Sequence, residues 1–383
     1  MTSDQEILYS IALSKIKGIS LINANQLYQA MGDATSVFAN RNDIRSYVPE
    51  ASQRVVDIFK DVDYAIREAE RELQFMEGKS VRCLTQKDAD YPRRLRNCTD
   101  APIALYYCGN ANLNNVKVIS MVGTRKITPY GAGLCKEFVA DLKRICPDVL
   151  IVSGLAYGVD IHCHRAALDN NMETVGVLAH GLDRIYPYQH RATAVEMTRH
   201  GGLLTEYTSG TQPERYNFIS RNRIVAGMCD HCIVVESAEK GGSLITADLA
   251  NGYEREVHAF PGRTTDLYSA GCNKLIQQQK ARPIHNAQEF ANWCGWSSQH
   301  TDRTQPLQQE LFVQLSAEEQ AIVKALEGTD TRHINEIVNA TGMSSFSISA
   351  TLFDMEMKGL VSAYGGGRYK LSDTIIQGRN AII

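Results

Sequence analysis

The order of apolar and polar positions divides the chain into three segments, and the first of them is helical. In residues 1–75, apolar side chains recur at helical spacing, for example in the runs 7–13 and 55–59. This pattern predicts a small N-terminal helical domain, with a turn at 17–20 between two helices. Such a turn resembles a SAM-like or helix-hairpin-helix domain, whose turn amides can hold a DNA phosphate. A purely structural helical domain explains the same pattern.

Residues 76–296 show short apolar runs that alternate with helix-like stretches. The runs are continuous, as expected for strands that are buried on both faces. This order is typical of repeated βαβ units and predicts an α/β fold with a Rossmann-like, doubly wound, mostly parallel sheet. The predicted strands are Ser80–Leu84, Ile103–Cys108, Val116–Val122, Val149–Val152, Thr174–Leu178, Leu203–Thr205, Cys232–Val235 and Val257–Phe260.

The third segment begins with a linker. Residues 297–315 are polar, contain proline and lack an apolar period. Residues 316–374 then read as three helices followed by a β-ribbon, which is the order of a C-terminal winged-helix domain. The helices carry apolar residues in 322–326, 334–338 and 346–355, and the ribbon spans 360–371.

Composition fits an ordinary globular protein of two or three domains. The chain has 383 residues, of which 44% are hydrophobic, and 40 Lys and Arg stand against 43 Asp and Glu. The resulting net charge of −3 excludes a polybasic nucleic-acid coat, but it leaves room for a local basic site. There is no apolar run of about 18 residues, and the N-terminus is polar and acidic. The sequence therefore predicts no membrane span and no secretory signal.

Ten cysteines without a secretory signal predict reduced thiols and a cytoplasmic protein. The one close pair is Cys229 and Cys232. A single pair is too few for a four-ligand zinc site, and the adjacent apolar strand favours core packing. No metal site and no cofactor are predicted.

Ligands of open α/β sheets bind outside the carboxyl ends of the strands, and the sequence places four unusual segments there. The first contains Gly123, Thr124, Arg125 and Lys126, and it leads into a helix that Thr128 is suited to cap. A helix N-terminus presents free amides and partial positive charge, so this segment predicts a phosphate site. This segment does not match the glycine motif of dinucleotide-binding proteins, because the third glycine of that motif is missing.

The second segment begins with Ser153 and Gly154, small residues that let a ligand or another backbone approach closely. Asp160 is suited to cap the following helix, and a catalytic acid is the alternative. His162 and His164 point to different sides of that helix and predict no shared metal.

The third segment contains Lys240, Gly241, Gly242 and Ser243. Gly-Gly-Ser at the start of a helix predicts a second cradle of free amides, with Ser243 as the N-cap. The segment lacks the Gly-Lys-Ser/Thr of a P-loop, which gives little support to nucleoside triphosphate hydrolysis.

The fourth segment is the most informative, because it holds three arginines and two aromatic residues within nine positions, just before a predicted helix. Arginine holds phosphates bidentately, and an aromatic ring is a platform on which a base stacks. This combination predicts single-strand binding. The alternative places Phe218 in the core and pairs the arginines with Glu214 or Glu236. The predicted contact residues are Arg215, Phe218, Arg221, Asn222 and Arg223.

The winged helix is net acidic, with seven acids and five bases between Ser316 and Ser372. Asp354 and Glu356 lie on its would-be recognition helix, where they would repel phosphates. A protein-interaction or regulatory role is therefore favoured at least as much as DNA binding.

Five motifs in order closely resemble the DNA-processing protein A (DprA or Smf) family. The resemblance covers residues 76–285, and the flanking helical and winged-helix domains match the family's usual layout. The motifs are Gly-Thr-Arg-x-x-x-x-Tyr-Gly at 123–131, Ser-Gly-Leu-Ala-Tyr-Gly-Val-Asp at 153–160, Phe-x-x-Arg-Asn-Arg at 218–223, Gly-Gly-Ser-Leu-Ile-Thr at 241–246 and Gly-Cys-Asn-Lys-Leu-Ile at 271–276.

The resemblance implies a protein that is not an enzyme. It implies binding of incoming single-stranded DNA during natural transformation, loading of the RecA recombinase onto that DNA, and a homodimer formed through the Rossmann domain. By position, Arg125 would contact phosphate, Phe218 would stack a base beside Arg221 and Asn222, and the amides of 241–243 would hold a second phosphate. Arg215 would add a cation where family members often carry Lys, which keeps the charge and changes the geometry.

Two other functions remain open. The sheet with its Gly-Gly-Ser loop also resembles nucleoside-monophosphate phosphoribohydrolases, although their Pro, third Gly and catalytic Glu are missing here. In that case Glu236 or Asp248 would carry the chemistry. Alternatively, the winged helix would make the protein a regulator that binds duplex DNA.

Overall fold

The computed structural model describes residues 3–296, 315–327, 331–364 and 366–372. The chain divides into two compact units, Met1–Gln299 and His300–Ile383. Apart from Leu315, the predicted linker 297–315 lies outside the described residues, as do the last two residues of the predicted segment 316–374.

Six helices precede the sheet in the first unit, and side chains cap most of them. Ser3, Ser20, Asp33 and Ser52 each accept a hydrogen bond from the backbone amide three residues ahead. Gly18, with φ +86°, lies in the predicted turn between the first two helices. The helices are α1 (Asp4–Lys15), α2 (Leu21–Met31), α3 (Ala34–Ala39), α4 (Ile44–Tyr47), α5 (Gln53–Ile58) and α6 (Asp63–Met76).

These helices share their core with one edge of the sheet. Ile103, Ala104 and Tyr106, at the start of β2 (Ala104–Gly109), belong to the same buried cluster as Ile11 and Leu27. The helical segment therefore folds against the sheet.

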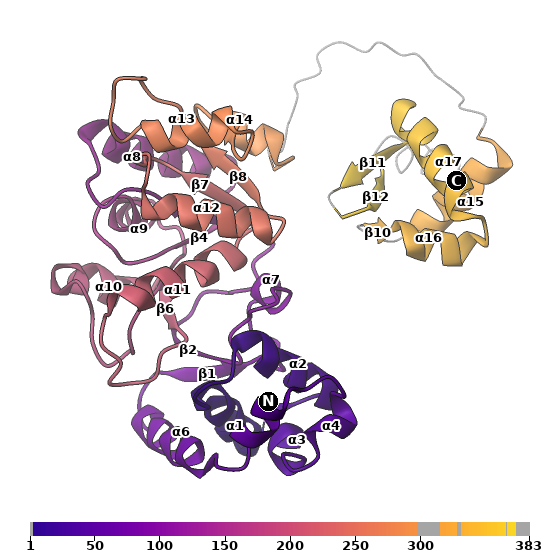
Figure 1. Cartoon of the computed structure of the whole chain (residues 1–383). Helices are drawn as coiled ribbons and strands as arrows, with labels where there is room; N and C mark the ends of the chain where they lie inside the picture. Colours follow the sequence, from indigo (N-terminus) through magenta and orange to yellow (C-terminus); the bar gives the residue numbers. More distant parts are fainter. Residues whose placement is uncertain (1–2, 297–314, 328–330, 365, 373–383) are drawn as a thin grey trace. The chain divides into compact units, whose positions relative to one another are not determined.

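A nine-stranded sheet in the order β1-β2-β6-β5-β4-β3-β7-β8-β9 forms the centre of the first unit (Figure 1). β2 is antiparallel to β1 and β6, and every pair from β6 to β9 is parallel. The predicted α/β fold and its mostly parallel sheet are confirmed. All eight predicted strands are present, and the additional β9 is too short to leave an apolar run. Besides β2, the strands are β1 (Arg82–Thr85), β3 (Val118–Val122), β4 (Leu150–Ser153), β5 (Thr174–Val177), β6 (Gly201–Thr205), β7 (His231–Val234), β8 (Glu256–Ala259) and β9 (Arg282–Pro283).

Helices cover both faces of the sheet. One buried cluster joins α7, α11, α12 and α13 to the sheet, and another joins α8, α9 and α14 to its opposite face. α10 packs beside β5 and β6. The helices are α7 (Arg93–Arg96), α8 (Pro129–Ile145), α9 (Val159–Asp169), the 3₁₀ turn η1 (Tyr188–His190), α10 (Arg191–Met197), α11 (Arg215–Gly227), α12 (Gly242–Gly252), α13 (Ala270–Gln277) and α14 (Ala287–Trp293).

The direction of winding changes at β3, which has β4 on one side and β7 on the other. At such a switch point the loops after neighbouring strands separate, and a crevice opens at the carboxyl ends of the strands. This is the place at which the sequence predicts its unusual segments.

The second unit is a winged helix, as predicted. Its three-stranded sheet has the order β10-β12-β11, and Ser316 and Glu319 form a capping box at its first helix. Ile348, Leu352 and Met355 of the third helix are buried, whereas Phe346 is 84% exposed. The elements are α15 (Ala317–Leu326), β10 (Arg332–His333), α16 (Ile334–Thr341), α17 (Ser345–Met357), β11 (Val361–Tyr364) and β12 (Arg368–Leu371).

All ten cysteines are free thiols, and Cys229 and Cys232 are fully buried in the sheet core. The prediction that this pair packs in the core is confirmed. Among the described residues, no helix is both long enough and apolar enough to cross a membrane.

Candidate nucleic-acid interface

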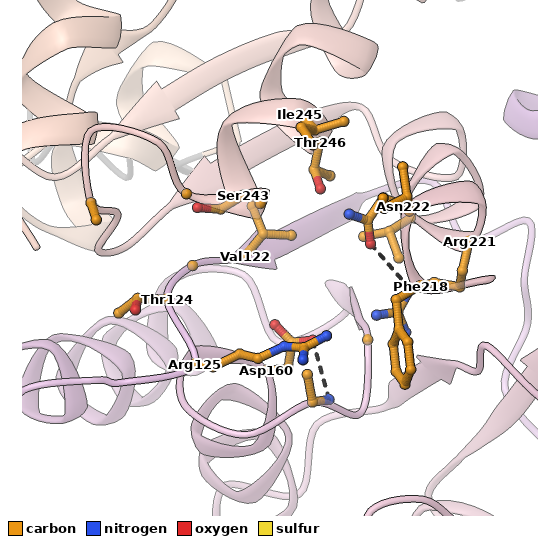
Figure 2. A pocket seen from close by; sticks show the side chains of 18 residues that line it. Val122, Thr124, Arg125, Asp160, Phe218, Arg221, Asn222, Ser243, Ile245 and Thr246 are labelled. Carbon is orange, nitrogen blue, oxygen red and sulfur yellow. Dashed lines mark hydrogen bonds between the residues drawn. The ribbon is translucent and has the colours of Figure 1, made fainter. Parts of the chain in front are cut away.

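A cavity of about 280 Å³ opens at the carboxyl ends of β3, β4 and β7 (Figure 2). It is built from the loops after these strands, from one side of α11 and from the first turn of α12. Ten of the fifteen predicted contact residues line it, so the four segments do converge. These ten are Gly123, Thr124, Arg125, Gly154, Phe218, Arg221, Asn222, Gly241, Gly242 and Ser243.

The loop after β3 is fixed by its backbone. The Thr124 amide donates to the Glu236 carbonyl at 2.7 Å, and the Val159 amide donates to the Thr124 carbonyl at 3.1 Å. This anchoring leaves the side chain of Arg125 exposed at the cavity, where its guanidinium carbon lies 5.0 Å from the ring centroid of Phe218. Lys126 is exposed as well, but it does not line the cavity.

The N-terminus of α8 is the place at which the sequence predicts a phosphate site. Thr128 caps the helix as expected, accepting from the Gly131 amide. However, the carboxylate of Glu236 occupies this terminus, because it accepts from the Thr128 amide at 2.9 Å and from the Thr128 hydroxyl at 2.5 Å. An internal anion thus already occupies this helix terminus and competes there with a phosphate.

The arginine-rich segment forms the helix α11 itself, not a loop before a helix as predicted. Phe218 is half-buried on this helix and lines the cavity, where Figure 2 shows Arg125 reaching towards it. The ring of Tyr186, which is 45% exposed, lies 5.8 Å from that of Phe218. Tyr186 is not among the predicted contact residues, because it lies in a long connection without a helical or strand pattern.

Gly154 lies between two buried charges of opposite sign. A Cβ at this position would come within 2.3 Å of the Asp160 carboxylate and 2.5 Å of the Arg221 guanidinium, so only glycine fits. Arg221 donates to the carbonyl of Val177 and, through Nε, to Asn222 Oδ1 at 3.3 Å. Burial raises the pKa of Asp160, and the attraction of Arg221 opposes this shift. Burial likewise lowers the pKa of Arg221 from its usual value.

Asp160 is not the N-cap of α9, because Gly158 holds that position with φ +78°. A side chain at Gly158 would collide with the Thr124 carbonyl at 2.0 Å, which explains the glycine. Asp160 lies in the first turn instead and accepts from the Ala156 amide at 3.3 Å. It lines the cavity beside the predicted residues.

The N-terminus of α12 faces the cavity with free amides. Gly241 is the N-cap, so the prediction that Ser243 holds this position is wrong. The Ser243 hydroxyl donates instead to the Ser237 hydroxyl at 2.8 Å. Among the described residues, the amides of Gly242 and Ser243 have no hydrogen-bond partner. This helix terminus, unlike that of α8, remains available to an anion.

Two further lining residues, Ile245 and Thr246, follow Gly242 at helical spacing on α12. They are not among the predicted contact residues, although the spacing i+3 and i+4 from Gly242 places them on the same side of the helix.

The other predicted residues lie elsewhere. Arg223 is buried and forms an ion pair with Glu206, and it also donates to the Asp100 carbonyl at 2.5 Å. The alternative of an ion-paired arginine is thus correct for Arg223, with Glu206 as the partner instead of Glu214 or Glu236. Ser153 is fully buried and donates to the Met121 carbonyl at 2.6 Å. Arg215 and Lys240 are exposed outside the cavity lining.

The two acids considered for a phosphoribohydrolase are engaged in other contacts. Asp248 pairs with Lys280 at 2.7 Å and is not part of the cavity lining. Glu236 is bound to Thr128 at the start of α8. The cavity instead combines a cationic arginine, free amides and an aromatic face, which are the groups that bind phosphates and bases.

Comparisons with known proteins match most of the chain to one family. The family described as DNA recombination-mediator protein A matches residues 82–294, and the DprA winged helix domain matches residues 305–367. A DNA processing protein DprA from Bacillus subtilis is 41% identical over 203 residues, which cover 52% of this chain and 67% of that protein.

Two solved structures are similar as well. DNA processing protein A from Streptococcus pneumoniae superposes with a TM-score of 0.65 at 28% identity, covering 76% of this chain and 98% of that one. DNA processing protein A from Helicobacter pylori, solved to describe its single-stranded DNA binding mode, has a TM-score of 0.51 at 30% identity and covers 56% and 95% of the two chains.

Proposed function

Because this chain belongs to the DNA recombination-mediator protein A family, we propose that it binds single-stranded DNA in the cavity at the carboxyl ends of β3, β4 and β7. The observation that carries the proposal is the pairing of Arg125 with the half-buried ring of Phe218, 5.0 Å apart. A cation beside an aromatic ring can hold a phosphate and its base together. The Helicobacter pylori relative, which binds single-stranded DNA, supports the same ligand.

In this proposal, different residues of the cavity lining contact different parts of the DNA strand. A base stacks on Phe218, Arg125 contacts the adjacent phosphate, and the amides of Gly242 and Ser243 donate hydrogen bonds to a second phosphate at the N-terminus of α12. Arg221 is buried and held by the Val177 carbonyl, so it contributes a fixed positive charge without having to reorient. None of these contacts reads the edge of a base, so binding tolerates any sequence.

We further propose that the protein hands the bound strand to the RecA recombinase during natural transformation, that it acts as a homodimer formed through the Rossmann-like unit, and that it is not an enzyme. Family membership supports these steps. A strand that is held mainly through its backbone keeps most base edges free for pairing, which a recombination mediator requires.

A titration of fluorescent oligo-dT tests the binding site. Phe218→Ala should lose about 1–3 kcal/mol for the stacked base. Arg125→Ala should weaken binding and lower the slope of log affinity against log salt by about 0.7, which corresponds to one phosphate. Arg144→Ala, an exposed arginine on α8 outside the cavity, is the matched control and should bind like the wild type. If the double variant of Phe218 and Arg125 binds as tightly as the wild type, the proposed site is wrong.

RecA loading is tested separately, by following RecA assembly on an oligonucleotide with and without this protein. We expect assembly to start earlier with the wild type and not with the Phe218 and Arg125 double variant. Tight DNA binding without any effect on RecA would overturn the mediator function and leave the DNA site intact.

A further inference from the structure

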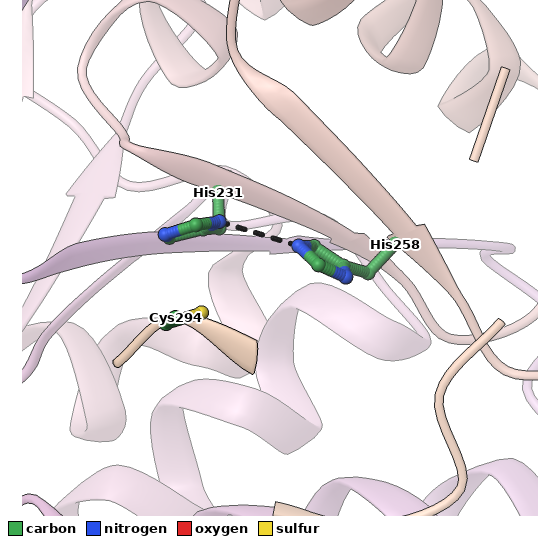
Figure 3. Close-up of side chains that lie close together, drawn as sticks. All are labelled: His231, His258 and Cys294. Carbon is green, nitrogen blue, oxygen red and sulfur yellow. Dashed lines mark hydrogen bonds between the residues drawn. The ribbon is translucent and has the colours of Figure 1, made fainter. Parts of the chain in front are cut away.

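A second cluster of chemically reactive side chains lies at the end of β7 that is opposite the cavity, beside β8 and α14. His231 begins β7, His258 lies on β8 and Cys294 follows the last residue of α14 (Figure 3). Their donor atoms, the two imidazole nitrogens and the thiol sulfur, all lie within 4.8 Å of one another. Three elements that are distant in the sequence therefore bring three good metal ligands to one point.

Glu256 supplies a fourth donor. Its Oε2 atom lies 3.4 Å from His231 Nδ1 and 3.7 Å from His258 Nε2, and these two nitrogens are 3.2 Å apart. Zinc bonds of about 2.0–2.3 Å at tetrahedral angles place ligand atoms about 3.3–3.8 Å from one another. The two imidazoles and the carboxylate already have nearly this spacing, and only the thiol has to approach.

The surroundings orient the ligands as second-shell groups do in metal sites. Trp293, adjacent to Cys294, donates its indole N–H to Glu256 Oε2 at 2.9 Å. Phe290 packs edge-on against both imidazoles, with ring centroids 5.4 and 5.1 Å away, and Trp296 packs edge-on against His231. The aromatic groups restrict the rotation of the histidine rings.

We propose that His231, Glu256, His258 and Cys294 bind one zinc-like divalent ion. Thiolate and imidazole ligands favour zinc over magnesium or calcium, which prefer oxygen. Four protein ligands leave no open position, so the ion is structural and not catalytic. It ties the end of α14 to β7 and β8. The site does not use the buried Cys229 and Cys232, although His231 lies between them in the sequence.

Cobalt titration of the metal-stripped full-length chain tests this proposal. We expect one Co²⁺ per chain, the visible bands of tetrahedral cobalt, a near-ultraviolet band from thiolate-to-cobalt charge transfer, and displacement by Zn²⁺. Cys294→Ser should lose the charge-transfer band and bind at least about tenfold more weakly. Cys108→Ser, a half-buried thiol on β2, is the matched control and should behave like the wild type.

If Cys294→Ser folds poorly, a second variant tests the same ion site. The Glu256 side chain is 55% exposed, so Glu256→Gln leaves the core intact and should still weaken cobalt binding. Zn²⁺ should raise the midpoint of thermal unfolding of the wild type and raise it less for Glu256→Gln. An absence of cobalt binding, or a cobalt spectrum unchanged in Cys294→Ser, would overturn the site.

The proposals of an ion site and of a DNA site can be tested independently of each other. The ion would bind beside His231, the first residue of β7, whereas the cavity lies beyond the carboxyl end of that strand. Single-stranded DNA affinity of Cys294→Ser should therefore equal that of the wild type.

Discussion

Asp160 is an acid inside a cavity that we propose to bind an anion. Burial raises its pKa, while Arg221, the Ala156 amide, Ser153 and Arg125 favour the ionised form. When ionised, its carboxylate repels a phosphate and offsets part of the positive charge of Arg221. Asp160 therefore tunes the affinity of the cavity and keeps the buried guanidinium in place.

This arrangement predicts a pH dependence of binding. As the pH falls through the raised pKa of Asp160, its carboxyl group is protonated and single-stranded DNA should bind more tightly. Asp160→Asn should bind about fivefold more tightly than the wild type near neutral pH, which corresponds to about 1 kcal/mol of removed repulsion. Titrations from about pH 5 to pH 8 at constant salt measure this. All other groups near the cavity are the same in both proteins, so the ratio of the two affinities isolates Asp160, and a ratio that does not change with pH would contradict the prediction.

Arg223 differs from Arg221, although only one residue separates them. Two positions along a helix correspond to a rotation of about 200°, so the two guanidinium groups leave α11 on opposite sides. Arg221 points to the cavity, and Arg223 points to Glu206. The sequence shows that the segment is cationic, but it does not show which arginine meets a carboxylate, because that carboxylate comes from another part of the chain.

The Arg223–Glu206 pair is buried and incompletely hydrogen-bonded, since Arg223 Nε and Glu206 Oε1 have no partner in the described structure. Arg223→Ala should lower the free energy of unfolding by about 3–5 kcal/mol, because it leaves a buried carboxylate alone. The double variant Arg223→Met with Glu206→Leu should recover most of this loss. Denaturant unfolding measures both, and DNA affinity of the folded protein should stay unchanged. A large loss of DNA affinity in the double variant would instead make Arg223 part of the site.

At the scale of elements, the strands could be predicted from the sequence and α11 could not, because the strands bury apolar side chains and α11 also buries arginines. Strands buried on both faces are continuous apolar runs, which a sequence displays directly. α11 instead carries buried arginines on two opposite sides, Arg221 on one and Arg223 on the other, so the usual apolar period of a helix is interrupted. Helix termini were predictable only in part. Thr128 caps α8 as expected, but the Thr128 amide itself donates to Glu236, whose position 108 residues later depends on the sheet order.

The free N-terminus of α12 gives a prediction that separates binding from stability. Gly242 is exposed, and a Cβ there would meet no atom within 4 Å, so side chains fit at this position. Gly242→Asp places a negative charge at the helix N-terminus, where it should stabilise α12 by about 0.3–1 kcal/mol. The same charge competes with a phosphate and should weaken DNA binding by about 1–2 kcal/mol.

Gly242→Ser is the matched control, because it adds a small side chain without charge and should bind DNA nearly as the wild type does. Thermal unfolding and oligo-dT titration are measured for both variants. Equal DNA affinity of the Asp and Ser variants would show that no phosphate lies at the α12 N-terminus.

At the scale of the whole molecule, the two units differ in the surfaces that they present. The first unit concentrates Arg125, Arg221 and the α12 amides at one cavity, while the net charge of the chain is only −3. In the winged helix, α17 exposes Phe346, Phe353 and Met357, at 84%, 63% and 75%, on the helix that reads DNA in other winged helices. Apolar side chains beside Asp354 and Glu356 are poorly suited to a phosphate backbone.

Removal of the winged helix should therefore leave single-stranded DNA binding almost intact. The first unit has its own buried clusters on both faces of the sheet, and the cavity is lined only by residues 122–246. A chain ending at residue 299 should keep its oligo-dT affinity within about threefold, which is less than 1 kcal/mol. Its thermal unfolding serves as the control for folding. A duplex-DNA regulator that acts through α17 would lose nearly all DNA affinity in this experiment. A competition titration of single-stranded against duplex DNA at two salt concentrations would show which form of DNA the full-length and the shortened protein prefer.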